Sequence, residues 1–235
     1  MHKRFQRALV VIGALGVIGF ALPAFVSATS HAGTGKSAPA SSSAQPRPHN
    51  VTCHNGDILT GFFGNVTVAK DNFCELLQAV VEGNVTANDA VQLGIDHSTI
   101  TGNVVATDVS DNGWICGSAI GGNVTITKTE SNPETNFSPG QWVIGDTGTF
   151  GGQPYCSNTT LDQVPGNFIV GDLNFTNNMS GATISNNDIE DDLNCTGNAP
   201  APTGTSNQVD GPNTGQCSTM GGGTDHDTTS PGDND

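Results

Sequence analysis

One short motif recurs along this chain at a nearly constant spacing. It begins with Gly-Asn and continues with residues that are mostly β-branched or apolar. Four copies begin at Gly64, Gly83, Gly102 and Gly122. A fifth copy is read at Gly166-Asn167-Phe168-Ile169-Val170, and two related units at Gly171 and Asp191 keep the same period. Self-similarity at so short a period is typical of a solenoid, in which each repeat forms one coil of a continuous stack.

The residues inside each repeat predict β-strands. In the first copy, Val66 and Val68 alternate with Asn65 and Thr67, which is the period of a strand with one buried face. Two further apolar columns are Phe62, Val81, Ile100 and Ile120, two positions before the glycines, and Leu76, Ile95 and Ile115, seven positions before them. A single coil cannot bury these side chains, so the coils must stack and pair their strands. We therefore expect an all-β fold, a β-solenoid with coils of about 19 to 20 residues.

Coil length distinguishes two kinds of parallel β-helix. Left-handed β-helices are built from hexapeptides, which give coils of about 18 residues with a strict six-residue rhythm. The repeats of this chain are longer and less even, and a longer segment interrupts them, which favours the right-handed form. A helical repeat is excluded because apolar residues at spacings of three and four are absent.

The rest of the chain divides into three segments. Residues 1–28 have the pattern of a secretory signal peptide, with basic residues before an apolar stretch, and cleavage is expected after Ala28, with Ala32 as the alternative. Residues 29–50 are rich in Ser, Ala and Pro and predict a disordered, flexible linker. The solenoid is expected over 51–217, with an insertion at 128–165 that bulges from one face. Residues 218–235 are expected to form a disordered acidic tail.

Charge restricts the partners of the chain. Its 7 basic and 22 acidic residues give a net charge of -15. Loss of residues 1–28, with three bases and no acids, would leave 4 bases against 22 acids, a net charge of -18. A surface of that sign repels phosphate backbones and anionic lipids, so no nucleic acid is expected as a partner, and no membrane after signal cleavage. A glycan or another cell-surface component is compatible with this charge.

Six cysteines follow the expected cleavage site. They are Cys53, Cys74, Cys116, Cys156, Cys195 and Cys217. An even number in an exported protein predicts three disulfides, and the absence of any Cys-x-x-Cys pair disfavours a metal site. Several pairings are open from sequence. Sequence neighbours, Cys53–Cys74, Cys116–Cys156 and Cys195–Cys217, are favoured because a solenoid places each coil beside the previous one.

The closing segment of the repeats has a distinctive sequence. It runs Leu193-Asn194-Cys195-Thr196-Gly197-Asn198-Ala199-Pro200-Ala201-Pro202 and ends at Gly215-Gln216-Cys217. Together with the signal, the linker and the Gly-Asn-Val repeats, it resembles a group of small secreted proteins from high-GC Gram-positive bacteria, the actinobacteria. The resemblance covers residues 50–217. Those proteins are of unknown function and are expected to form β-helices, so the resemblance implies fold and export and brings no activity.

Few residues in the repeats suit catalysis. A polysaccharide lyase of the pectate type needs a strong base, and from residue 51 onward the only Lys or Arg residues are Lys70 and Lys128. A hydrolase needs two carboxylates roughly 5 to 10 Å apart. The candidates, expected to stack on one turn of adjacent coils, are Asp96, Asp108 and Asp111. Aspartate is also favoured at turns for its backbone hydrogen bonds alone, and His97 is expected to be a solvated turn residue. The chain is therefore expected not to be an enzyme.

An acidic run is the best candidate for an ion site. Asp188, Glu190, Asp191 and Asp192 could supply oxygen ligands to Ca²⁺, but their spacing matches neither a helix-loop-helix calcium loop nor the calcium-binding nonapeptide of solenoids. A solvated acidic turn is preferred and no cofactor is expected; Asp225-His226-Asp227 in the tail is a weaker candidate. Nine Asn-x-Ser/Thr sequons follow from the Asn and Thr of the repeat, whose Asn column is expected to hydrogen-bond coil to coil.

Two binding surfaces remain as alternatives. Trp142 and Tyr155, in the expected insertion, could stack on sugar rings and make the protein carbohydrate-binding or carbohydrate-active, although Trp142 could as easily fill the core. The outward column from Thr67 to Thr125 could bind ice or a mineral, although a short column interrupted by Val105 is explained by stacking alone. The preferred hypothesis is a secreted, extracellular, non-catalytic structural or interaction protein of the bacterial cell surface or matrix.

Overall fold

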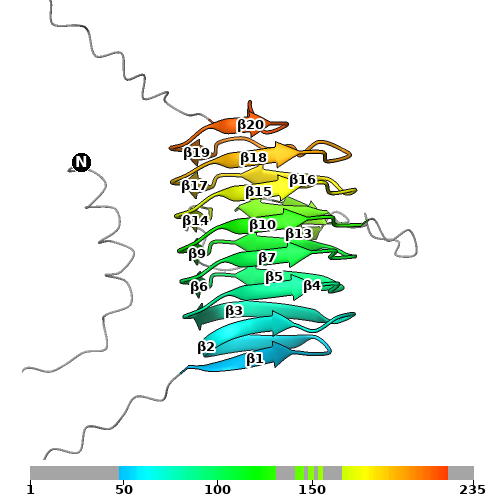
Figure 1. Cartoon of the computed structure of the whole chain (residues 1–235), viewed down its shortest axis with the longest axis vertical. Helices are drawn as coiled ribbons and strands as arrows, with labels where there is room; N and C mark the ends of the chain where they lie inside the picture. The colour runs from blue at the N-terminus through cyan, green and yellow to red at the C-terminus, as the bar shows by residue number, and fades with distance from the viewer. Residues whose placement is uncertain (1–47, 131–140, 146–147, 151–152, 156–165, 222–235) are drawn as a thin grey trace, which may run out of the picture. The chain divides into compact units, whose positions relative to one another are not determined.

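The computed structural model describes residues 48–130, 141–145, 148–150, 153–155 and 166–221. Within these residues every regular element is a β-strand. All but two of the strands belong to one 18-stranded sheet, which winds into a stack of coils (Figure 1). The predicted all-β solenoid is therefore confirmed.

Most coils contribute one strand to each of three parallel faces, here called faces A, B and C. Face A contains β1 (His49–Cys53), the end of β2 (Asp57–Val68), β4 (Val85–Asn88), β7 (Val104–Thr107), β10 (Val124–Thr127), β15 (Leu173–Thr176), β18 (Leu193–Thr196) and β20 (Asn213–Gly215). Face B contains the start of β2, the start of β3 (Phe73–Val81), β5 (Gln92–Asp96), β8 (Gly113–Cys116), β11 (Trp142–Gly145) and β16 (Ala182–Ser185). Face C contains the middle of β2, the end of β3, β6 (Thr99–Ile100), β9 (Ala119–Ile120), β14 (Phe168–Ile169), β17 (Asp188–Ile189) and β19 (Gln208–Val209).

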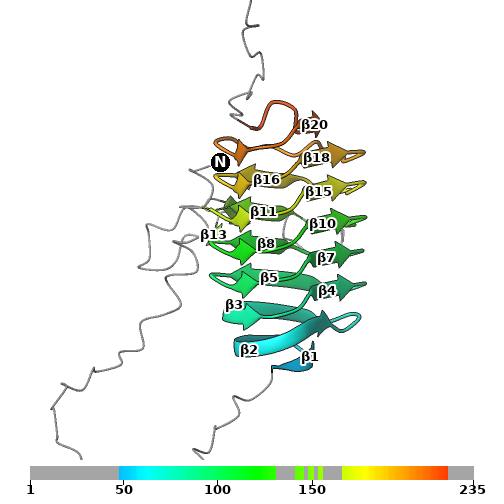
Figure 2. The same ribbon diagram turned by 60° about the vertical axis from the view of Figure 1, so that its left-hand side comes forward.

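The coils wind in the right-handed sense. In Figure 1 the strands of face A lie on the near side and run from left to right, while the chain rises from blue to red. Turning the molecule by 60° moves face A to the right and the strands of face B to the left, so face B lies on the far side of the first view (Figure 2). A chain that runs rightward in front, returns behind and rises in each turn forms a right-handed coil.

Inward side chains form continuous columns along the stack. On face A the column consists of Val66, Val85, Val104, Val124, Leu173 and Leu193, all fully buried. On face B, Leu76, Ile95, Ile115, Ile144 and Ile184 form a second buried column. Burial of one such aliphatic side chain contributes about 1.5 to 3 kcal/mol, so the columns supply the stabilisation that a single coil lacks.

Two positions expected from the sequence are wrong, one in the apolar column of face C and one in the placement of a repeat. Phe63, not Phe62, lies in line with Val81, and Phe62 is 66% exposed. The cause is a shorter corner in this coil, since Phe63 lies closer in sequence to Val66 than their partners Val81 and Val85 lie to each other. The expected fifth repeat at Gly166 is also displaced, because its Phe168 and Ile169 form β14 on face C.

The expected insertion at 128–165 is only partly an insertion. Its residues Trp142–Gly145 form β11, which pairs with β8 and β16 inside the solenoid. Outside the stack, β12 (Gly148–Phe150) and β13 (Gln153–Tyr155) form an antiparallel pair. The stack also extends beyond residue 217, since Met220 is buried and Gly221 forms a bridge with Asn207. The expected signal with its cleavage after Ala28, most of the linker and residues 222–235 lie outside the described residues.

Disulfides join neighbouring coils at both ends of the stack. Cys53 bonds to Cys74 with a Cα–Cα distance of 6.0 Å, and Cys195 bonds to Cys217 with a Cα–Cα distance of 5.2 Å. Both predicted pairs are confirmed. None of the described cysteines is a free thiol. Because Cys156 lies outside the described residues, the third pair, Cys116–Cys156, stays a prediction.

Candidate functional site

Asparagine side chains bind adjacent coils together at the corner between faces C and A. The backbone N–H groups of Asn84, Asn103 and Asn123 donate to the Oδ1 atoms of Asn65, Asn84 and Asn103 at 2.8 to 2.9 Å. Asp172 continues the row by donating its N–H to Asn123 Oδ1. The predicted Asn ladder is thus confirmed, and the sequons at Asn65, Asn84 and Asn123 have a structural cause.

Two more polar ladders lie inside the stack, and sequence analysis missed both. At the corner between faces B and C, Ser98, Ser118, Asn167, Asn187 and Asn207 are all buried and bond from coil to coil. At the corner between faces A and B, the ladder consists of Thr129, Asn178, Asn198 and Gln216. Their carboxamide N–H groups also donate to backbone carbonyls such as those of Ile115 and Phe175. A repeated Asn three residues after an inward residue, as at Asn178, Asn187 and Asn198, was the available signal.

The three candidate aspartates do not form a site. Asp96 ends β5, at the corner between faces B and C, whereas Asp108 and Asp111 lie between β7 and β8, at the opposite end of face B. The residue that stacks with Asp108 is Asp89, since Asn88 pairs with Thr107 and the N–H of Asp89 donates to the Thr107 carbonyl. The predicted stacking of all three carboxylates is therefore wrong.

Backbone geometry explains the turn residues. Asp89 and Asp108 have φ of 52° and 53°, in the left-handed region that Asn, Asp and Gly adopt most readily. Lys128 and Asn177 continue the same turn column with φ of 56° each. Asp108 therefore suits this position because aspartate readily adopts the left-handed backbone conformation, in agreement with the sequence analysis, which attributed the turn aspartates to backbone structure.

His97 is not the solvated residue that the sequence predicted. It has φ of 47°, as a turn residue does, but its side chain is only 14% exposed. Its Nδ1 is 2.5 Å from Oδ1 of Asp96, whose side chain is 19% exposed. The ring also lies over Gly117 of the next coil, where an added Cβ would approach the imidazole to 3.2 Å. The pair is thus held in the wall of the solenoid.

The outer side of face B carries a carboxyl that the sequence analysis overlooked. Glu75 follows Ile58 and precedes Gly94 and Trp114 in one outward column. The indole of Trp114 lies over Gly94, where a Cβ would collide with it. Burial, reinforced by the negative charge of Asp96, raises the pKa of the Glu75 carboxyl above its ordinary value. A carboxyl with raised pKa near a second carboxylate and an indole is a candidate for acid–base chemistry.

Trp142 belongs to the core and offers no ligand surface. It is fully buried, and a Cβ on Gly113 of the preceding coil would lie 2.5 Å from its ring. The glycine thus makes room for the indole, which fills the solenoid as the alternative interpretation expected. The side chain of Tyr155, the other aromatic candidate, lies outside what the structure describes.

The acidic run separates in the structure. Asp188 lies in β17 on face C beside Phe168 and Gln208, while Glu190 and Asp191 are exposed at the following corner. Asp192 enters the first corner ladder, donating its N–H to Asp172 Oδ1 at 3.2 Å. In the described part of the chain no three His, Cys, Asp or Glu side chains are placed to hold a metal ion.

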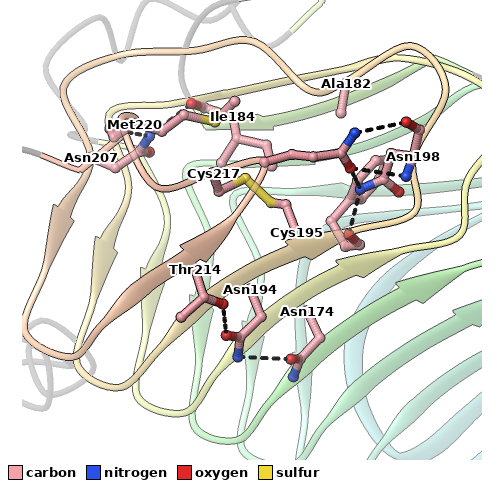
Figure 3. The surroundings of a disulfide bond; sticks show 12 residues. Asn174, Ala182, Ile184, Asn194, Cys195, Asn198, Asn207, Thr214, Cys217 and Met220 are labelled. Atoms are coloured by element: carbon pink, nitrogen blue, oxygen red, sulfur yellow. Dashed lines mark hydrogen bonds between the residues drawn. A yellow bond between two sulfur atoms is a disulfide. The ribbon is translucent and has the colours of Figure 1, made fainter.

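The outer side of face A carries two parallel rows of polar side chains. The first row is Thr52, Thr67, Thr86, Val105, Thr125, Asn174, Asn194 and Thr214. The second row, two residues further along each strand, is Asn88, Thr107, Thr127, Thr176 and Thr196. Sequence analysis found only part of the first row. Figure 3 shows its C-terminal end, where Asn174, Asn194 and Thr214 are linked beside the Cys195–Cys217 disulfide.

Comparison with known proteins gives no further assignment. No protein-family model matches the chain. No curated protein and no solved structure matches it either.

Proposed function

We propose that this chain is an exported, non-catalytic structural or surface-binding protein. The observation that carries the proposal is the use of its polar side chains to join coils. Asn187, for example, accepts from and donates to the coils on either side, through Asn167 Nδ2, Asn207 Oδ1 and the Ile144 carbonyl. Buried side chains fixed in such ladders make the stack rigid, and a carboxamide does not act as an acid or base near neutral pH.

Export is supported by the covalent chemistry of the stack. Disulfides such as Cys53–Cys74 and Cys195–Cys217 persist in oxidising compartments and are rare in reducing ones. They are consistent with an extracellular protein. No helix among the described residues is long and apolar enough to cross a membrane.

A second candidate function, action on a carbohydrate, is favoured by one place on the molecule. Glu75 has a raised pKa, Asp96 lies close enough to contribute to that rise, and Trp114 lies in the same outward column. Hydrolysis of glycosides uses one carboxylic acid and one carboxylate, and indole rings stack on sugars. We rank this function second because the pair lies on the outer wall of a sheet, without a described cleft around it.

The two functions differ in a direct assay. The oxidised protein, in which the disulfides are intact, is incubated with pectin, alginate, cellulose or chitin, with and without Ca²⁺. We expect it to release no product. Matched variants Glu75→Gln and Asp96→Asn identify any activity that depends on face B. Product release that disappears in either variant would replace the proposed function with the second one.

A further inference from the structure

Face A differs in charge from the rest of the molecule. The chain has 22 acidic residues, yet none of the side chains in the two outward rows carries a charge. Asp89, Asp108 and Lys128 come directly after members of the second row, at the edge of the face. Lys70 and Asp89 form an ion pair of 3.6 Å at that edge, off the rows themselves. The face is therefore a neutral strip on an acidic protein.

The two rows form a regular lattice. Strands pair in unbroken parallel register from β4 to β18, so neighbouring side chains of one row are about 4.8 Å apart. Members of the two rows on one strand are separated by two residues, about 6.7 Å. All the side chains in the rows are at least partly exposed. Five consecutive coils, from β4 to β18, contribute a member to both rows.

Contacts within the rows restrict the side chains. The hydroxyl of Thr176 donates to the Thr127 hydroxyl at 3.3 Å, and Asn194 Nδ2 donates to Asn174 Oδ1 at 3.1 Å. β-Branched residues also have few χ1 rotamers on a strand. These contacts and rotamer limits reduce the freedom of the side chains before any ligand arrives, which lowers the entropy lost on binding.

We propose that face A binds ice. This deepens the function proposed above by naming the occupant of a non-catalytic surface. The uncharged hydroxyl, carboxamide and methyl groups of the two rows repeat about every 4.8 Å along the stack, so face A can contact an ordered water surface at many points at once. Methyl groups order the water around them, while hydroxyl groups hydrogen-bond to it and anchor the lattice. Charged groups, which hold their own hydration shells, are kept at the edge.

A polysaccharide is the competing occupant and fits face A less well. Protein sites for sugars commonly place aromatic rings against the pyranose face. Neither row contains an aromatic residue. Trp114, the partly exposed indole of the described strands, lies on face B instead.

The test compares substitutions on face A with a matched substitution on another face. Ice recrystallisation and thermal hysteresis are measured with the oxidised protein and with variants Thr127→Tyr, Val105→Thr and Thr99→Tyr. Thr127→Tyr places a ring in the centre of the second row and is expected to reduce activity to that of an inert protein. Thr99→Tyr makes the same change on face C and is expected to leave activity unchanged. Val105→Thr gives the apolar member of the first row a hydroxyl group and is expected to increase activity.

Circular dichroism confirms the fold of each variant, and Val105→Thr provides the decisive comparison if Thr127→Tyr does not fold. No inhibition of ice growth by the unsubstituted protein, or equal losses in Thr127→Tyr and Thr99→Tyr, would overturn the proposal. Sedimentation with cellulose or chitin that Thr127→Tyr abolishes would assign the face to a polysaccharide instead. The proposed non-catalytic function fails only by product release, so the two results are separate.

Discussion

At the scale of the residue, the buried carboxamides are the most demanding positions in the solenoid. A buried amide stabilises the protein only when its donors and its acceptor all find partners, since each unsatisfied group costs about 1 to 3 kcal/mol. Asn178 meets this condition. Its Oδ1 accepts from the N–H and the hydroxyl of Thr129, and its Nδ2 donates to Asn198 Oδ1 and the Ile126 carbonyl. One side chain therefore satisfies groups in both neighbouring coils.

Replacing Asn178 by Ala is expected to lower the free energy of unfolding by roughly 3 kcal/mol, because two or more buried polar groups lose their partners. Asn174→Ala is the control, since Asn174 is partly exposed and its hydrogen bond is to Asn194 on the surface. We expect that change to cost under about 1 kcal/mol. Urea denaturation of the oxidised proteins measures both values. Similar losses of unfolding free energy in the two variants would show that the internal ladder stabilises the fold no more than a surface hydrogen bond does.

At the scale of the element, much of the stack could be predicted because coil period and strand period both repeat in the sequence. Val66, Val85, Val104 and Val124 occupy equivalent positions and were correctly placed in one column. One error arose where the same short sequence occurs at two different corners of the coil. Gly166-Asn167 has the same sequence as the start of the face A motif, but Asn167 lies in the internal ladder before face C. Only the pairing of β14 with β9 shows that this copy of the motif leads into face C and not into face A.

The candidate site was less predictable than the fold. Asp96 was singled out by residue type, but its neighbour Glu75 belongs to the preceding coil and meets it only through the pairing of β3 with β5. Similarly, Trp142 looked like part of a surface insertion because it lies in the segment after Lys128, where the repeat is interrupted. Gly113, which leaves room for the Trp142 ring because it has no side chain, belongs to another coil. Contacts between coils follow from register, which the sequence specifies only where the repeat is regular.

Glu75 on β3 gives a prediction for the pH dependence of stability. Burial and the charge of Asp96 raise the pKa of Glu75 above the ordinary 4.5. At a pH between the unfolded and the folded pKa, the folded state therefore holds a proton that the unfolded chain has already released. The free energy of unfolding therefore falls as the pH rises from the unfolded pKa through the folded pKa. Glu75→Gln removes this fall.

The melting temperature of Glu75→Gln, relative to that of the unsubstituted protein, is expected to increase as the pH rises above 4.5. The exposed Glu82 provides a control, since Glu82→Gln makes the same change in charge outside face B. A difference that stays constant with pH in Glu75→Gln, or changes equally in Glu82→Gln, would contradict the assigned environment of Glu75.

At the scale of the whole molecule, stability depends on position along the stack. A central strand such as β7 pairs with a coil on each side, β4 and β10, whereas in the described structure β1 and β20 each pair with one neighbour in the sheet. In solenoids, each repeat interacts mainly with its nearest neighbours, so terminal coils open most easily. The two disulfides lie where this weakness is greatest.

The C-terminal disulfide therefore gives a prediction for local opening. A double variant, Cys195→Ala with Cys217→Ala, removes a cross-link over 22 residues, which loop-closure entropy values at about 3 kcal/mol. Because nearest-neighbour contacts dominate, we expect hydrogen exchange to accelerate in β18 and β20 while β7 keeps its protection. The matching variant at Cys53 and Cys74 should accelerate β1 and the start of β2 instead. Mass spectrometry of peptides from the exchanged protein measures both gradients, and equal acceleration along the whole stack would mean that the solenoid unfolds as one cooperative unit.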